Sequence, residues 1–115
     1  MENRLARKLL LVGWDAADWR LARPLLEKGW MPHLRTLIEG GSSGNLASAQ
    51  PMICPMLWTS VVTGKRAHRH GIHGFVEPRA GGGGIRTSAS TSRTGKAIWN
   101  ILTQCGLRTL SLIHI

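Results

Sequence analysis

The sequence predicts an α/β fold in which parallel strands are flanked by helices, and three observations lead to this prediction. Residues 8–14 (KLLLVGW) form a continuous apolar run, which is typical of a strand buried on both faces of a parallel sheet. Segments with apolar residues at helical spacing follow it. A second apolar run ends the chain at 107–115 (LRTLSLIHI). This alternation of strands and helices is the pattern of an α/β layer fold.

Two helices and a short strand are expected after the first strand. The segment 18–30 has leucines at helical spacing, with Asp18 as a plausible N-cap and Gly29 as a plausible stop. The segment 31–41 begins a second helix with a proline and ends in two glycines. Residues 44–48 (GNLAS) fit a short strand that returns the chain to the sheet.

The second half of the chain contains two more predicted helices separated by a long loop. The first covers residues 54–64 and the second residues 96–106, and each ends in a glycine. Residues 65–95 are expected to form a flexible loop, because they are basic, rich in histidine and glycine, and lack helical spacing. Four consecutive glycines, Gly81 to Gly84, predict a surface turn within this loop.

Composition limits the class of protein. Of the 115 residues, 43% are hydrophobic, which is enough for a core. Fifteen Lys and Arg against six acidic residues give a formal charge of +9, which suits an anionic partner. Cys54 and Cys105 are the two cysteines and are expected to be free thiols. The sequence shows no signal peptide and no apolar stretch of transmembrane length, so we expect a cytoplasmic protein with no membrane partner.

Two residues are candidates for chemistry because they come where a strand gives way to a helix. Cys54 precedes Pro55, which is favoured at the first helical position, so Cys54 is the expected N-cap. The free amides of a first helical turn favour an anion, and Cys54 is either a nucleophile there or a buried, inert thiol. Asp15, directly after the first strand, is either a metal ligand or a helix cap shared with Asp18. Cys105 is expected in the core.

Other motifs are weaker. His68, His70 and His73 suggest zinc, but their spacing fits no standard zinc motif, and we expect solvated loop histidines. The stretch TGKR (63–66) lacks the first glycine and the final Ser/Thr of a P-loop. Residues 54–58 (CPMLW) do not match the C-x-P-x-R motif of a sulfatase-type modified cysteine.

Four stretches together, LLLVGWDAADW, GNLAS, PMICPMLWTSVVTGKRAHRHGIHGFVEP and RTGKAIWNILTQCGLRTL, resemble the type I phosphodiesterase/nucleotide pyrophosphatase family of the alkaline phosphatase superfamily. The likeness covers residues 8 to 110 in family order. It implies an alkaline-phosphatase-like parallel sheet flanked by helices. It also implies a metal-dependent hydrolase of phosphate mono- or diesters, with two divalent metal ions, expected to be zinc, and a small-molecule phosphate ester as substrate.

The resemblance also implies roles for individual residues. Asp15 matches the first metal-ligating aspartate of the family, and Cys54 stands where the family has its Thr or Ser nucleophile, which also contacts a metal. A TG…HGI signature, expected to be scaffold, is matched by Thr63, Gly64, His70, Gly71 and Ile72. Nucleotide pyrophosphatases carry an asparagine three residues after the nucleophile, where this chain has Leu57.

The family's other metal ligands lie further along the chain than the stretches matched here. We therefore expect residues 1–115 to be the N-terminal portion of such a hydrolase domain, an inactive fragment. The alternative from the charge of +9 is a small basic module that binds nucleic acid or another anion. A nucleic-acid partner is not expected, because the chain has no Tyr, one Phe and few stacking platforms. The sequence leaves the substrate, the metal and the oligomeric state open.

Overall fold

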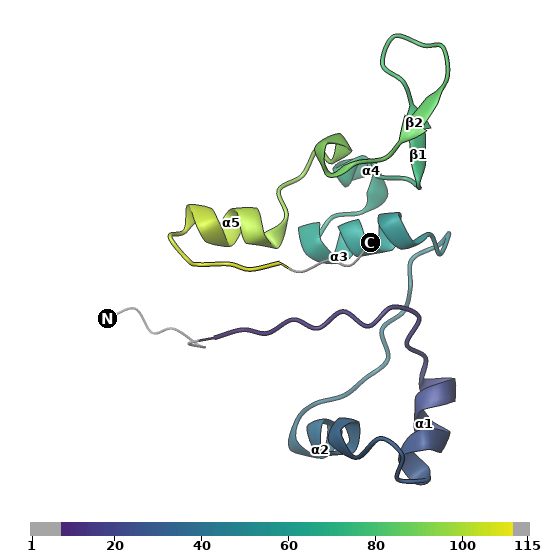
Figure 1. Ribbon diagram of the computed structural model, residues 1–115, viewed down its shortest axis with the longest axis vertical. Coiled ribbons are helices and arrows are strands. Elements are labelled where there is room, and N and C mark those ends of the chain that lie inside the picture. The colour runs from purple at the N-terminus through teal and green to yellow at the C-terminus, as the bar shows by residue number, and fades with distance from the viewer. Residues whose placement is uncertain (1–7, 112–115) are drawn as a thin grey trace. The chain divides into compact units, whose positions relative to one another are not determined.

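The computed structural model describes residues 8–111. The chain divides into two compact units, Met1–Asn45 and Leu46–Ile115 (Figure 1). Each unit is described by itself. Among the described residues, no helix has the length and the hydropathy needed to cross a bilayer.

The first unit contains two helices, α1 (Trp19–Glu27) and α2 (Pro32–Gly40). The Asp18 side chain caps α1 by accepting a hydrogen bond of 2.8 Å from the Arg20 backbone N–H, as the sequence predicts. After α1, Gly29 adopts φ +74°, and the Trp30 N–H donates to the Leu25 carbonyl at 2.9 Å, which closes the helix end. The Arg35 guanidinium of α2 donates to the Leu26 carbonyl and joins the two helices.

The second unit begins with α3 (Cys54–Thr63) and α4 (Ala67–His70). Gly64 ends α3 in the left-handed conformation at φ +65°, and its N–H donates to the Ser60 carbonyl at 2.9 Å. The chain then forms a hairpin of β1 (Val76–Pro78) and β2 (Ile85–Thr87), a 3-10 turn η1 (Ser90–Ser92), and α5 (Ile98–Gln104).

The hairpin is the sheet that the described residues form, and it is antiparallel. Its register pairs Val76 with Thr87, Glu77 with Arg86 and Pro78 with Ile85. The four glycines at 81–84 connect the two strands, as the sequence predicts, and all have positive φ. The segment 65–95 is therefore more ordered than the flexible loop that the sequence predicts, because it contains α4, the hairpin and η1.

A small core lies in the second unit. Met56, His70, Ile72 and Ala97 have exposed fractions of 0–6%. Met56 lies in α3 and His70 ends α4. Ile72 comes two residues after α4, and Ala97 directly precedes α5. In the first unit, by contrast, no described residue is buried.

The parallel sheet predicted from sequence is not confirmed by the described residues. Residues 8–14, 44–48 and 107–111 form no strand, and residues 112–115 lie outside the described residues. The side chains of Leu9, Leu10, Leu11 and Val12 are 65–85% exposed. A strand exists only when a neighbour completes its ladder of hydrogen bonds, and the described residues supply no such neighbour. The apolar run therefore indicates a tendency to be buried but does not identify the partner.

Candidate active site

Cys54 is the first residue of α3, and its thiol is free and exposed. The sequence predicts Cys54 as the N-cap, but the N-cap is Ile53, with extended φ −114° and ψ 115°, because Pro55 lies one position further into the first turn than expected. No side chain caps this helix start. Of the two alternatives for Cys54, the structure gives the accessible thiol and not the buried one.

Asp15 lies in the turn that follows the extended residues 8–14. The next residue, Ala16, has φ +55°, in the left-handed region. The cap of α1 is Asp18, whose carboxylate accepts from the Arg20 N–H. The role of Asp15 as a metal ligand stays a prediction.

The proposed ligands Asp15 and Cys54 belong to different units, the first and the second. Their convergence on one metal ion stays a prediction. Among the described residues, no three His, Cys, Asp or Glu side chains come together as a group that could hold a metal ion.

His70 is fully buried, with an exposed fraction of 0%, and both ring nitrogens have partners. The Ile72 N–H donates to Nδ1 at 3.1 Å, so Nδ1 is an acceptor and the proton of the neutral ring is on Nε2. Nε2 lies 3.0 Å from Ser60 Oγ and donates to it. Ser60 Oγ in turn donates to the Met56 carbonyl at 2.9 Å. Burial of the ring, with a smaller effect of His73, lowers the pKa of His70 below its usual 6.5.

The sequence prediction for the histidines is therefore half right. His68 and His73 are exposed, as expected. The prediction that His70 is a solvated loop residue is wrong. It ends the short helix α4, where the turn after α3 directs its side chain back against Ser60. Since both nitrogens are occupied by protein groups, His70 stabilises the junction of α3 and α4.

The rest of the TG…HGI signature also makes contacts within the second unit. Thr63 Oγ1 donates to the Thr59 carbonyl at 2.6 Å and accepts from the Lys65 N–H at 3.3 Å. Gly71 ends α4 at φ +81°. Ile72 is 5% exposed and belongs to the core. These positions hold α3 and the segment after it in a fixed geometry.

Cys105 follows α5 directly and is exposed. The sequence predicts it in the core because it continues the apolar spacing of the helix. The prediction is wrong because α5 ends at Gln104, and Gly106 turns the chain at φ +74°. Cys105 is thus a second accessible thiol, outside the site, and it provides a matched control for Cys54.

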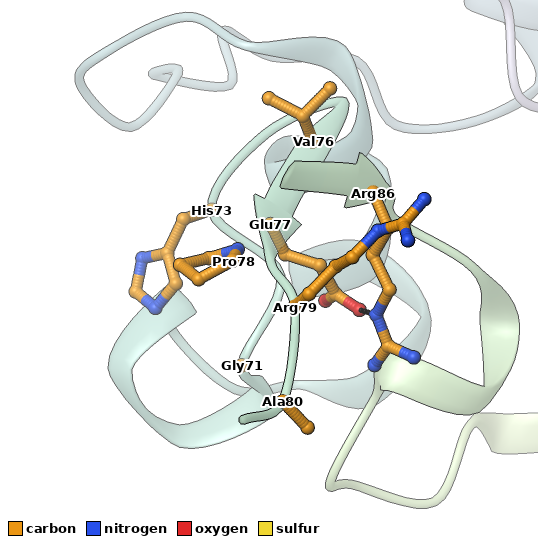
Figure 2. A pocket seen from close by; sticks show the side chains of 8 residues that line it. All are labelled: Gly71, His73, Val76, Glu77, Pro78, Arg79, Ala80 and Arg86. Atoms are coloured by element: carbon orange, nitrogen blue, oxygen red, sulfur yellow. Dashed lines mark ion pairs between the residues drawn. The ribbon is translucent and has the colours of Figure 1, made fainter. Parts of the chain in front are cut away.

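A cavity of about 430 Å³ opens beside the hairpin, and Figure 2 shows the side chains that line it. Glu77 is the acidic residue of its lining. The Glu77 carboxylate accepts from Arg86 Nε at 2.6 Å and from Ser92 Oγ at 2.6 Å. The hydrogen bond from Ser92, followed by the charge of Arg86, lowers the pKa of Glu77 below its usual 4.5. The sequence does not predict this group, because each strand of the hairpin has only three residues.

Comparison with known families identifies the chain. A family model described as type I phosphodiesterase / nucleotide pyrophosphatase matches residues 9–113 of the 115. The chain belongs to this family. The resemblance inferred from the sequence motifs is confirmed, and the matched range includes both Asp15 and Cys54. No curated protein and no solved structure matches the chain.

Membership in the type I phosphodiesterase/nucleotide pyrophosphatase family has two consequences. It associates the chain with hydrolases of the phosphodiesterase and pyrophosphatase type, and it indicates an α/β fold. The described helices agree with the helical part of that class, whereas the parallel sheet is not seen in residues 8–111.

Proposed function

We propose that this chain is the N-terminal portion of a metal-dependent hydrolase of small-molecule phosphate mono- or diesters. The observation that carries the proposal is the family match over residues 9–113, which spans the aspartate and the nucleophile position. Cys54 is the proposed nucleophile, and Asp15 and Cys54 are the proposed metal ligands. We also propose a cytoplasmic location for the reaction.

The accessible sulfur of Cys54 supports a nucleophilic role. It lies in the first turn of a ten-residue helix whose start has no side-chain cap, and backbone amides at such a position favour an anionic group. In the proposed reaction the sulfur attacks phosphorus, a P–S bond forms, and the P–O bond to the leaving alcohol breaks. The alcohol takes up a proton. Water then attacks phosphorus, the P–S bond breaks, and the thiol and the phosphate product are released.

The proposed metals require ligands beyond those described. When bound, divalent ions would supply Lewis-acid stabilisation of the phosphoryl oxygens. Residues 8–111 contain no group of three potential ligands, and catalytic zinc sites commonly use three protein ligands. We therefore propose that Asp15 and Cys54 are part of a site that groups outside the described residues complete.

This incompleteness predicts that the 115-residue chain alone does not turn over substrate. The purified chain with added Zn²⁺ is assayed against bis(p-nitrophenyl) phosphate, and the release of p-nitrophenol is compared with that of zinc in buffer. The expected rate equals the background. Zinc-dependent turnover that Asp15→Ala removes would show that the chain is catalytically complete and would contradict the fragment proposal.

The role of Cys54 as a metal ligand is tested with Co²⁺, because cobalt thiolates have a ligand-to-metal charge-transfer band in the near ultraviolet. We expect this band in the wild-type chain, its loss in Cys54→Ser and its retention in Cys105→Ser. Both thiols are exposed, so the two variants differ in position and not in accessibility. If the band is absent from the wild type, or if Cys105→Ser removes it equally, Cys54 is not the ligand.

A further inference from the structure

The cavity beside the hairpin has two arginines on one face. In a strand, residues two apart share a face, so Glu77 and Arg79 lie on the same side. Arg86 is paired directly opposite Glu77 in the register and therefore shares this side. The Arg79 N–H donates to the Gly84 carbonyl at 3.0 Å, which continues the ladder one residue past β1. Figure 2 shows both guanidinium groups on the side of the Glu77 carboxylate.

The two guanidinium groups are oriented by the protein. Arg86 contacts the Glu77 carboxylate through Nε, which leaves its two terminal nitrogens for another partner. Arg79 Nε donates to the Ile85 carbonyl at 3.3 Å. This contact does not use the two terminal nitrogens of Arg79. Orienting contacts of this kind reduce the entropy lost when a ligand binds.

The charges on this face favour an anion. Two arginines stand against one carboxylate, and that carboxylate already accepts from Arg86 and Ser92. The Glu77 side chain is 18% exposed and the Arg86 side chain 54% exposed. The positive partner is therefore the more accessible member of the ion pair. Guanidinium groups bind phosphate oxygens through paired N–H donors. A carboxylate ligand can bind to these donors with only two oxygens.

We propose that this cavity binds a small phosphate, either inorganic phosphate or the phosphoryl group of a small ester, through Arg79 and Arg86. The cavity of about 430 Å³ and the two arginines define a compact site, whereas a nucleic-acid strand requires a longer basic track. The proposal does not rest on the hydrolase function, because neither Asp15 nor Cys54 lines the cavity.

The test is a titration of the ¹⁵N-labelled 115-residue chain with inorganic phosphate at constant ionic strength, followed by NMR. We expect saturable shifts of the Arg79 and Arg86 Nε–H signals and of the backbone amides of residues 79–86. Arg79→Ala should weaken binding at least fivefold, and Arg79→Lys should give an intermediate loss because it keeps the charge but not the fork. Arg23→Ala, an exposed arginine of α1, is the matched control and should bind like the wild type.

Several results would overturn the proposal. Shifts that rise linearly without saturation, or equal weakening by Arg79→Ala and Arg23→Ala, would indicate general counterion accumulation. Acetate that binds as tightly as phosphate would contradict the choice of phosphate. An oligothymidylate whose affinity falls with salt more steeply than two phosphate contacts predict, a logarithmic slope of about −1.4, would show a nucleic-acid surface instead. If the NMR spectrum of Arg79→Ala loses signal dispersion, this variant is unfolded and the affinity of Arg79→Lys for phosphate is the test instead. Wild-type affinity of Arg79→Lys would overturn the role of the guanidinium fork.

Discussion

Ser60 Oγ lies 3.0 Å from His70 Nε2, and this hydrogen bond connects α3 to α4 across the Gly64 turn. This bond belongs to a series of hydrogen bonds that runs from the Ile72 N–H through the imidazole and the serine hydroxyl to the Met56 carbonyl. The imidazole and the Ser60 hydroxyl each act once as donor and once as acceptor. The buried ring is therefore satisfied only while it is neutral and only while Ser60 is present.

Ser60→Ala should destabilise the chain by about 1–3 kcal/mol, because the buried Nε2–H of His70 loses its acceptor. The free energy of unfolding is measured by urea titration with circular dichroism. Ser90→Ala is the matched control, since Ser90 is exposed in η1, and it should change stability by less than about 0.5 kcal/mol. If Ser60→Ala unfolds at the wild-type midpoint, the hydrogen bond does not stabilise the folded chain.

Stability should fall as the pH drops below 6.5. The pKa of His70 is lowered in the folded chain by burial, so between the folded value and 6.5 the unfolded chain binds a proton that the folded chain does not. The contribution of His70 to the free energy of unfolding is therefore fully present above pH 6.5. Below pH 6.5 it decreases by at most about 1.4 kcal/mol per pH unit, until the folded pKa is reached. Glu77, whose folded pKa is also lowered, adds a separate loss below 4.5.

The pH effect is assigned by comparing unfolding free energies at pH 7.5 and pH 5.5 in two variants. His70→Gln should show a smaller difference than the wild type, because the titrating group is gone. His33→Gln, at an exposed position of α2, should keep the wild-type difference. An unchanged difference in His70→Gln would mean that another group titrates.

Gly71→Ala should destabilise the chain by about 1–2 kcal/mol, because φ is +81° at this position and an L-residue is strained there. An added Cβ would also lie 3.4 Å from Thr94 Cγ2 and 3.5 Å from the Ser92 carbonyl oxygen. Gly74→Ala is the control, since no heavy atom lies within 4 Å of its Cβ position. Thermal or urea unfolding distinguishes the two, and equal stability of both variants would contradict the strain argument.

The helices were predictable because their signals are local. Asp18 before α1 and the glycines at 29, 64 and 106 act within a few residues of the helix ends that they define. The scaffold role of the TG…HGI signature was inferred from family resemblance, and the contacts of His70 and Gly71 agree with it. These parts of the fold required no knowledge of distant contacts.

The remaining features depend on contacts between residues distant in sequence. The run at 8–14 indicates that these residues favour burial, but a strand requires a partner that the run does not specify. The Ser60–His70 bond spans ten residues and depends on the geometry of the turn between two helices. Each hairpin strand has three residues, too few for a clear alternation, so the pairing of Glu77 with Arg86 was not visible. The site prediction for Asp15 and Cys54 similarly depends on a juxtaposition that sequence cannot supply.

The most direct test of the account is the affinity for Zn²⁺ of four chains: wild type, Asp15→Asn, Cys54→Ser and the double variant. If both residues bind one ion, each single change should weaken binding by at least about tenfold, the lower end of what even an outer-shell partner contributes. The double variant should lose less than the product of the two losses, because coupled ligands are non-additive. Asp18→Asn, which retains a capping side chain, should bind zinc like the wild type. Asp15→Asn with wild-type affinity, or losses that simply multiply, would contradict a shared metal ion.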